Sequence, residues 1–101
     1  MTEVVIVKRD KLRSVSLEGH AGYGKRGKDI VCAAVSILCA SLDASCHGVT
    51  DYKSSGTGGS GEFFARYDGH SREVNAQFDM FITGLMLLAQ TYPKNVKITS
   101  A

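Results

Sequence analysis

The sequence lacks several features that would each point to a particular class of protein. No stretch approaches the run of about 18 apolar residues that a membrane-spanning helix requires, so no membrane partner is expected. The first residues, Met1 to Val4, lack a basic segment followed by an apolar stretch, so no secretory signal is expected. Charge of one sign does not dominate, because 12 Lys and Arg oppose 10 Asp and Glu. The net charge of +2 implies no strong polyanion as partner, and no direct contact with nucleic acid is expected.

Paired cysteines are also missing. The three cysteines, Cys32, Cys39 and Cys46, lie seven residues apart in one predicted helix. That spacing separates neighbouring thiols by about 10 Å, whereas bridged cysteines have Cα atoms within about 7 Å of each other. We therefore expect free thiols in a reducing cytoplasm. Without a Cys-x-x-Cys pair, a zinc site that also uses His47 or His70 is not favoured, and neither a metal nor a cofactor is expected.

The chain is predicted to be one domain, residues 1–101, of the α+β class. Its 101 residues show neither a repeat nor a linker, and domains commonly have about 50 to 250 residues. A chain this short buries a modest core, and many such domains gain stability by pairing. The predicted element order is ββαββαβ, which indicates a mostly antiparallel sheet that carries two helices.

Alternating and β-branched residues predict the strands. The predicted strands are Val4–Lys8, Leu12–Gly19, Val49–Lys53, Glu62–Tyr67 and Val96–Thr99. The first two form a hairpin across a tight turn at Asp10-Lys11. The segment Ser54 to Gly61 contains no core-forming residue, so it is predicted to be a mobile loop.

Two helices are predicted from caps and apolar spacing. Asp29 is a good N-cap for Ile30 to about Cys46, and apolar residues on most faces of this segment predict a mostly buried helix that stops near Gly48. Ser71 is the expected cap of the second helix, which ends at Pro93. A stripe at spacings of three and four residues marks its buried face: Val74, Phe78, Phe81, Leu85, Leu88 and Tyr92.

The second helix carries more apolar surface than one packed face needs. The residues outside the stripe are Met80, Ile82, Met86 and Leu87. We interpret part of this surplus as surface that meets another subunit, which predicts a homodimer. An exposed edge of the sheet is the other candidate dimer surface.

Residues 19–32 bring an imidazole and a thiol within reach of one another. His20 follows Gly19 at the end of a predicted strand, and Cys32 lies in the first turn of the helix that Asp29 begins. Unpaired N–H groups and the positive end of the helix dipole stabilise a thiolate there. A thiolate with a general base beside it favours nucleophilic catalysis. Cys32 is therefore predicted to be the nucleophile, and His20 its general base and later acid.

Neighbouring residues have supporting roles in this interpretation. Asp29 either caps the helix or orients His20, and the spacing leaves both open. Ser36 lies one turn after Cys32 on the same face, where its hydroxyl can hydrogen-bond near the sulfur. The N–H groups at the helix start are candidates for an oxyanion hole.

A glycine-rich and basic loop, Ala21 to Lys28, separates the two candidate catalytic residues. Its glycines are Gly22, Gly24 and Gly27. They make the loop mobile, and we expect it to close over a bound peptide. Its basic residues are Lys25, Arg26 and Lys28. These residues add positive potential near the thiol.

Other interpretations remain open from the residues alone. Cys32 can be a small buried side chain, like Cys39 and Cys46, with His20 bonded to backbone. Residues 22–28 match a phosphate-binding loop up to its last position, where Asp29 replaces the Ser or Thr that holds magnesium. The basic loop, with Arg66 and Arg72, also fits a non-catalytic binding module for RNA or an acidic protein.

One family matches this pattern closely. Gly19-His20-Ala21, the loop, and Gly27-x-Asp29-Ile30-Val31-Cys32-Ala33-Ala34-Val35-Ser36 resemble the signature of the ribosomal-processing cysteine proteases, called Prp or YsxB-like. The length, the element order and the glycine-rich middle segment also resemble that family. The resemblance therefore covers nearly the whole sequence.

The resemblance implies an activity and a substrate. In this family the residues that match Cys32 and His20 form a catalytic dyad, with those that match Asp29 and Ser36 nearby. Members are cytoplasmic homodimers of bacteria, and they remove a short N-terminal extension from the precursor of large-subunit ribosomal protein L-twenty-seven. The cleaved motif ends in Phe-Phe-Ala or a similar sequence. The resemblance thus implies an endopeptidase that acts through a thioester.

The chain itself contains Phe63-Phe64-Ala65. We interpret these residues as part of a strand rather than as a self-recognition sequence, because a protease needs an extended and accessible segment.

Overall fold

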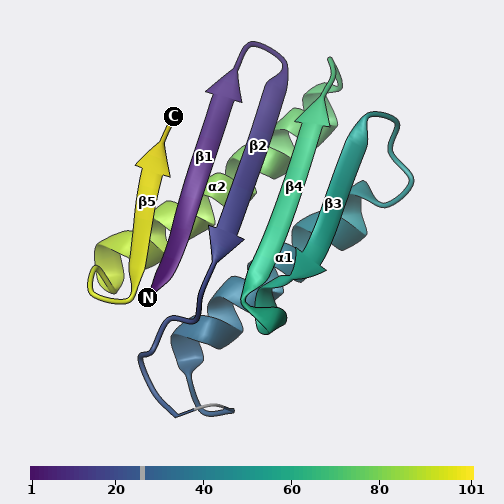
Figure 1. Ribbon diagram of the computed structural model, residues 1–101. Coiled ribbons are helices and arrows are strands. Elements are labelled where there is room, and N and C mark those ends of the chain that lie inside the picture. Colours follow the sequence, from purple (N-terminus) through teal and green to yellow (C-terminus); the bar gives the residue numbers. More distant parts are fainter. Residues whose placement is uncertain (26) are drawn as a thin grey trace.

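Five strands form one sheet, and both helices cover the same face of it (Figure 1). The computed structural model describes residues 1–25 and 27–101, so Arg26 of the predicted basic loop lies outside the described residues. The strands are β1 (Thr2–Arg9), β2 (Leu12–Glu18), β3 (Tyr52–Thr57), β4 (Glu62–Asp68) and β5 (Val96–Ser100). The helices are α1 (Ile30–Cys46) and α2 (Arg72–Thr91), with a short 3-10 turn, η1 (Gly58–Ser60), between β3 and β4. The predicted element order is confirmed.

The sheet is mostly antiparallel, as predicted for the α+β class. Its strand order is β3-β4-β2-β1-β5. Each neighbouring pair is antiparallel except β1 and β5, which run parallel. The predicted hairpin joins β1 to β2, with Arg9 opposite Leu12 and Asp10 in the turn at a φ of 43°.

The core lies between the sheet and the helices. On β2 the predicted alternation holds, because Val15 and Leu17 are buried. From α2, Phe78 is completely buried, and burying a side chain of this kind contributes about 1.5–3 kcal/mol. The two helices approach closely at Gly84, where a Cβ would lie 2.9 Å from the Leu38 side chain.

The prediction that Ser54 to Gly61 form a loop is wrong for the first half of this segment. The structure continues β3 as far as Thr57, and Ser54 to Thr57 pair with β4. Apart from half-buried Tyr52, the side chains of β3 are exposed, because β3 is an edge strand. Backbone pairing therefore defines β3, and hydrophobic patterning could not find it. The predicted strand Val49–Lys53 overlaps β3 only at its end.

The expectation that α1 is mostly buried is also wrong. Ile30 is 57% exposed and Ile37 is 64% exposed, although Val31, Val35 and Leu42 are buried. A two-layer structure covers one face of each helix and leaves the other open. The apolar surplus predicted for α2 is present at Met80, Met86 and Leu87, whereas Ile82 is buried.

The strand interpretation of Phe63-Phe64-Ala65 is confirmed. These residues belong to β4, which pairs with β2 on one side and β3 on the other. Phe63 and Ala65 are buried. No helix among the described residues is long and apolar enough to cross a membrane.

Candidate active site

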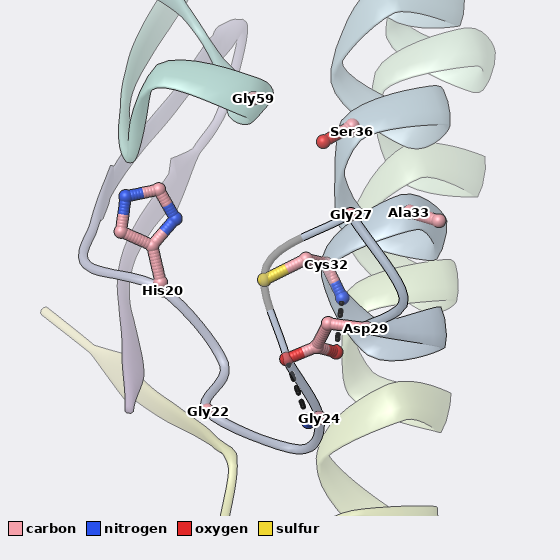
Figure 2. Close-up of a pocket in the computed structure, with 9 residues that line it drawn as sticks. All are labelled: His20, Gly22, Gly24, Gly27, Asp29, Cys32, Ala33, Ser36 and Gly59. Atoms are coloured by element: carbon pink, nitrogen blue, oxygen red, sulfur yellow. Dashed lines mark hydrogen bonds between the residues drawn. The ribbon is translucent and has the colours of Figure 1, made fainter.

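The candidate site lies at the end of the sheet where β2 stops and α1 begins (Figure 1). A cavity of about 580 Å³ opens there. It is lined by His20, Gly22, Gly24, Gly27, Asp29, Cys32, Ala33, Ser36 and Gly59. The structure therefore gathers around one cavity every residue that the sequence analysis selected for the site, apart from Gly19. Figure 2 shows the Cys32 sulfur on the side of α1 that faces the His20 ring.

Asp29 connects the start of α1 to the preceding loop. Its Oδ1 accepts hydrogen bonds from the N–H groups of Val31 and Cys32, both at 3.0 Å. Its Oδ2 accepts from Tyr23 at 2.8 Å and Gly24 at 3.1 Å. The N–H bond from Cys32 is the largest of the effects that hold the pKa of the Asp29 carboxyl below its ordinary value, and partial burial opposes it. Asp29 is thus the helix cap, as predicted, and it also binds the backbone of the preceding loop at Tyr23 and Gly24.

The second role considered for Asp29 was to orient His20, and the hydrogen bonds of the Asp29 carboxylate do not support it. Within residues 1–25 and 27–101, His20 makes no hydrogen bond to Asp29. The predicted mobility of the whole loop also needs revision at Tyr23 and Gly24, because both are bonded to Asp29. The Tyr23 ring further packs edge-on against Tyr92, with ring centroids 5.1 Å apart.

The Cys32 sulfur receives its hydrogen bond from outside the helix. The N–H of Ala21 donates to the Cys32 Sγ at 3.3 Å. Three of the helix-start groups considered for an oxyanion hole are already occupied, since the N–H groups of Val31 and Cys32 bond the Asp29 carboxylate and that of Ala33 bonds the Asp29 carbonyl at 3.0 Å. The donor that faces the sulfur is therefore Ala21, which the sequence analysis did not select.

His20 is exposed at the cavity wall, two residues beyond the end of β2. Its ring lies against Gly61, where an added Cβ would be 2.8 Å from the His20 Nε2. The N–H of Gly19 donates to the Gly61 carbonyl at 2.8 Å, which joins the segment before His20 to the segment after η1. Gly19 has a φ of 91°, and a Cβ there would lie 2.3 Å from the Met1 carbonyl oxygen. A glycine is thus needed at position 19 because of its backbone conformation and the nearby Met1 carbonyl, and Gly19 does not line the cavity.

Ser36 lines the cavity one turn after Cys32, as predicted, and Figure 2 shows its hydroxyl directed to the same side as the sulfur. A second cavity, of about 480 Å³, shares Ser36 and Gly59 with the first. It extends along α1 past Ala40 to His47. The two cavities are therefore neighbours along α1, beside the segment that contains η1, and we call them together the groove, with the second cavity as its outer part.

The other two cysteines differ from Cys32 in their surroundings. Burial raises the pKa of the Cys39 thiol to about 12, and burial also raises the pKa of Cys46. Cys32 is partly exposed in the cavity, and all three are free thiols. Cys39 and Cys46 are therefore the small buried side chains that the sequence analysis expected.

Three contributors to the site were not selected as site residues in the sequence analysis, although Ala21 belongs to the Gly19-His20-Ala21 motif. Ala21 and Gly61 touch the two candidate catalytic side chains only through backbone or through a missing Cβ. The third is Asn95, whose side-chain Nδ2 donates to the Ala21 carbonyl at 3.0 Å across 74 positions of sequence.

The family model described as "Cysteine protease Prp" matches residues 1–97. The chain belongs to the Prp family. The resemblance found in the sequence is confirmed, and the protein is a cysteine protease. The cavity that holds the thiol and the imidazole is consistent with this membership.

Solved structures support the same assignment. A structure described as the essential ribosomal processing protease Prp from S. aureus, in complex with a covalently linked product peptide, is 25% identical, with a TM-score of 0.83 and coverage of 100% of both chains. SMU.848 from Streptococcus mutans is 29% identical, with a TM-score of 0.77 and coverage of 99% of this chain and 93% of that one. A substrate-peptide complex of S. aureus Prp is 23% identical, with a TM-score of 0.75, and shows the shared fold. Comparison with curated proteins gave no match.

Proposed function

We propose that this Prp-family protease removes a short N-terminal extension from the precursor of ribosomal protein L-twenty-seven. The observation that carries the proposal is the cavity that places Cys32 and His20 on facing walls in a chain of this family. The ribosomal processing protease from S. aureus, which was solved with a linked product peptide, supports the substrate class. The whole segment 1–101 would act as one protease domain.

The proposed reaction is acyl transfer from a peptide to the Cys32 sulfur. The thiolate attacks the scissile carbonyl, and the resulting intermediate breaks the C–N bond as the His20 imidazolium protonates the leaving amine. His20 then takes a proton from water, which attacks the thioester and restores the thiol. No hydrogen bond joins the His20 ring to the sulfur within the described part of the chain, and such contacts often tighten when substrate binds.

The groove beside α1 supports an extended peptide as substrate. Its outer part is walled by Ala40 and Ala44 of α1 and by Phe63 of β4. Apolar walls favour apolar side chains, so this part of the groove would take the aromatic residues of a Phe-Phe-Ala motif. The glycines Gly22, Gly24 and Gly27 line the inner part and would form the substrate loop.

A peptide assay tests the activity directly. Purified protein is incubated with a peptide that contains Leu-Gln-Phe-Phe-Ala-Ser, and the products are identified by mass spectrometry. We expect cleavage after the alanine by the wild type and loss of cleavage in Cys32→Ala and in His20→Ala. Cleavage that survives Cys32→Ala would reject the nucleophile. Failure of the folded wild type to cleave would favour the binding module for RNA or ribosomal assembly.

A matched pair of variants tests the groove. Ala40→Phe fills the outer cavity, whereas Ser45→Phe adds the same side chain at an exposed position of α1 that does not line it. We expect Ala40→Phe to raise the KM for the peptide about tenfold or more and Ser45→Phe to leave it unchanged, since lost pocket contacts of this kind are worth about 1–3 kcal/mol. Equal KM values for the two variants would place the peptide elsewhere.

A homodimer is part of the proposal. The apolar side chains exposed on the helices, Ile37 at 64%, Met80 at 78% and Leu87 at 58%, are a surface that a second copy would bury. Light scattering is expected to give a dimer mass for the wild type and for Gln90→Glu. Leu87→Glu should give a monomer. A monomeric wild type would contradict the proposal.

The proposed location is the bacterial cytoplasm. The substrate is a ribosomal protein precursor, and the three free cysteines fit a reducing compartment. Arg66 of the candidate RNA-binding patch is paired with Asp68 at 3.5 Å. This pairing reduces the positive charge that Arg66 offers to a nucleic acid.

A further inference from the structure

The hydrogen bond to the Cys32 sulfur comes from a backbone segment that has no helix or strand to hold it in place. Ala21 lies between the end of β2 and the start of α1, and its N–H donates to the Sγ at 3.3 Å. A donor at this position stabilises negative charge on sulfur, but only while the segment keeps its orientation. Two hydrogen bonds hold this segment from outside. The Met1 amino group donates to the His20 carbonyl, in the same peptide unit as the Ala21 N–H, at 2.6 Å, and a side chain binds the next carbonyl, that of Ala21.

Asn95 supplies the side-chain bond of these two. Its Nδ2 donates to the Ala21 carbonyl at 3.0 Å. Asn95 is itself fixed on both sides, because its N–H donates to the Tyr92 carbonyl at 2.9 Å and its carbonyl accepts the N–H of Thr2 at 2.8 Å. Ala21 is 2% exposed and Asn95 is half-buried, and Thr2, which binds the Asn95 carbonyl, is 1% exposed.

The hydrogen bond between Asn95 and Ala21 joins two loops that are 74 positions apart in the sequence. Asn95 stands in the turn between α2 and β5, and Figure 1 shows that turn beside the N-terminus at the end of the sheet where β2 stops. Asn95 therefore joins the last loop of the chain to the loop that precedes Cys32. It does not line the cavity that holds the candidate catalytic residues.

We propose that Asn95 is a positioning residue, which holds the Ala21 segment so that the Ala21 N–H points at the Cys32 sulfur. The thiolate part of this inference stands on geometry alone. A second part rests on the proposed function: when the sulfur attacks a peptide carbonyl, charge moves to an oxygen two bonds from the sulfur. The N–H of Ala21, which already donates to the sulfur, is a candidate donor for that charge, whereas those of Val31, Cys32 and Ala33 are bonded to Asp29.

The test compares two asparagines that make the same kind of bond. Asn95→Ala removes the bond to Ala21. Asn75→Ala removes a hydrogen bond of 3.2 Å from the Asn75 Nδ2 to the Gly69 carbonyl. Asn75 lies in the first turn of α2 and Gly69 lies just before that helix, and neither residue lines the cavity. Asn95→Asp is a second variant, which keeps the size of the side chain and its backbone bonds but loses the donor. Thermal unfolding selects the variants that fold.

The first measurement is the rate at which iodoacetamide alkylates Cys32 as a function of pH, followed by peptide mass spectrometry. We expect the midpoint of this profile to rise by about half a unit to one unit in Asn95→Ala and Asn95→Asp, since a lost donor disfavours the thiolate. Asn75→Ala should match the wild type. Identical profiles for wild type and folded Asn95 variants would overturn the proposal.

The second measurement is cleavage of the Phe-Phe-Ala peptide. We expect kcat to fall about tenfold in the Asn95 variants with KM unchanged, because the lost positioning is felt mainly in the transition state. If the wild type cleaves the peptide and the Asn95 variants keep both its alkylation profile and its kcat, the positioning role is rejected and the proposed function stands. A wild type that does not cleave, with the alkylation midpoint still shifted in the variants, would reject the proposed function and leave the positioning role supported.

Discussion

Gly61 lies directly against the imidazole of His20, with space for a hydrogen and none for a methyl group. A Cβ at Gly61 would stand 2.8 Å from the His20 Nε2. Gly61 is buried, has a φ of 81°, and caps η1 through an N–H bond to the Gly58 carbonyl at 3.3 Å. The short turn after β3 therefore sets the wall against which the candidate base rests.

We predict that Gly61→Ala lowers kcat by tenfold or more, because the added methyl displaces the His20 ring. Gly48→Ala is the matched control, since Gly48 has a φ of 79° and no atom within 4 Å of an added Cβ. Both variants should lose about 1 kcal/mol of stability to backbone strain at positive φ. Thermal unfolding and steady-state kinetics measure the two effects. Equal kcat values for the two variants would show that the position of the His20 ring during catalysis does not depend on the missing side chain at Gly61.

Substitutions at Asp29 separate its two roles. Ser retains an oxygen that can cap α1 but does not reach the loop, whereas Ala loses both functions. We predict that Asp29→Ser and Asp29→Ala both lose activity, and that Asp29→Ser keeps the greater thermal stability. Full activity in Asp29→Ser would mean that the bonds to Tyr23 and Gly24 do not matter for turnover.

The same carboxylate predicts a pH dependence of stability. Because the folded-state pKa of Asp29 is lowered from 3.8, its contribution is present above that pH and is lost as the pH falls through the lowered value. The difference in unfolding free energy between wild type and Asp29→Ala should therefore shrink as the pH falls below about 4. Denaturant unfolding between neutral and acidic pH measures it, and a constant difference would contradict the expectation.

Only one of the three thiols is predicted to react at mild pH. Burial raises the pKa of Cys39 to about 12, and Cys46 is also buried, so both thiols stay protonated and shielded at pH 8. Intact-mass analysis after iodoacetamide treatment should show a single adduct, which disappears in Cys32→Ala. Two adducts on the folded protein would mean that the core around α1 opens readily.

The chain is predicted not to cleave itself at Phe63-Phe64-Ala65. These residues pair with strands on both sides, and Ala65 is 0% exposed, so the protease has no free extended segment to bind. Prolonged incubation should leave the 10.8 kDa mass unchanged. A free peptide with the sequence of residues 60–69 is the matched control, since it presents the same residues unfolded. Cleavage of the folded chain at this motif would contradict the burial argument.

Local patterns predicted most of the fold because their causes are local. The alternation at Val15 and Leu17, the cap at Asp29 and the cap at Ser71 each depend on a few adjacent residues, and the structure confirms all three. The extent of β3 was missed because its stability comes from pairing with β4. The exposure of Ile37 was missed because residue type does not reveal which face of a helix a second layer will cover.

Residue types and their spacing were sufficient to identify the candidate chemistry: a thiol at a capped helix start, an imidazole at a strand end, and a glycine-rich loop between them. These features lie within residues 19–36, so local reasoning could find them. Packing of the sheet and the helices determines which other groups meet those side chains. The bonds from Ala21 to Cys32 and from Asn95 to Ala21, and the contact of Gly61 with His20, join segments that meet because of this packing. The residue types are visible in the sequence, but a backbone donor, an amide side chain or a glycine does not reveal which partner it will meet in the folded chain.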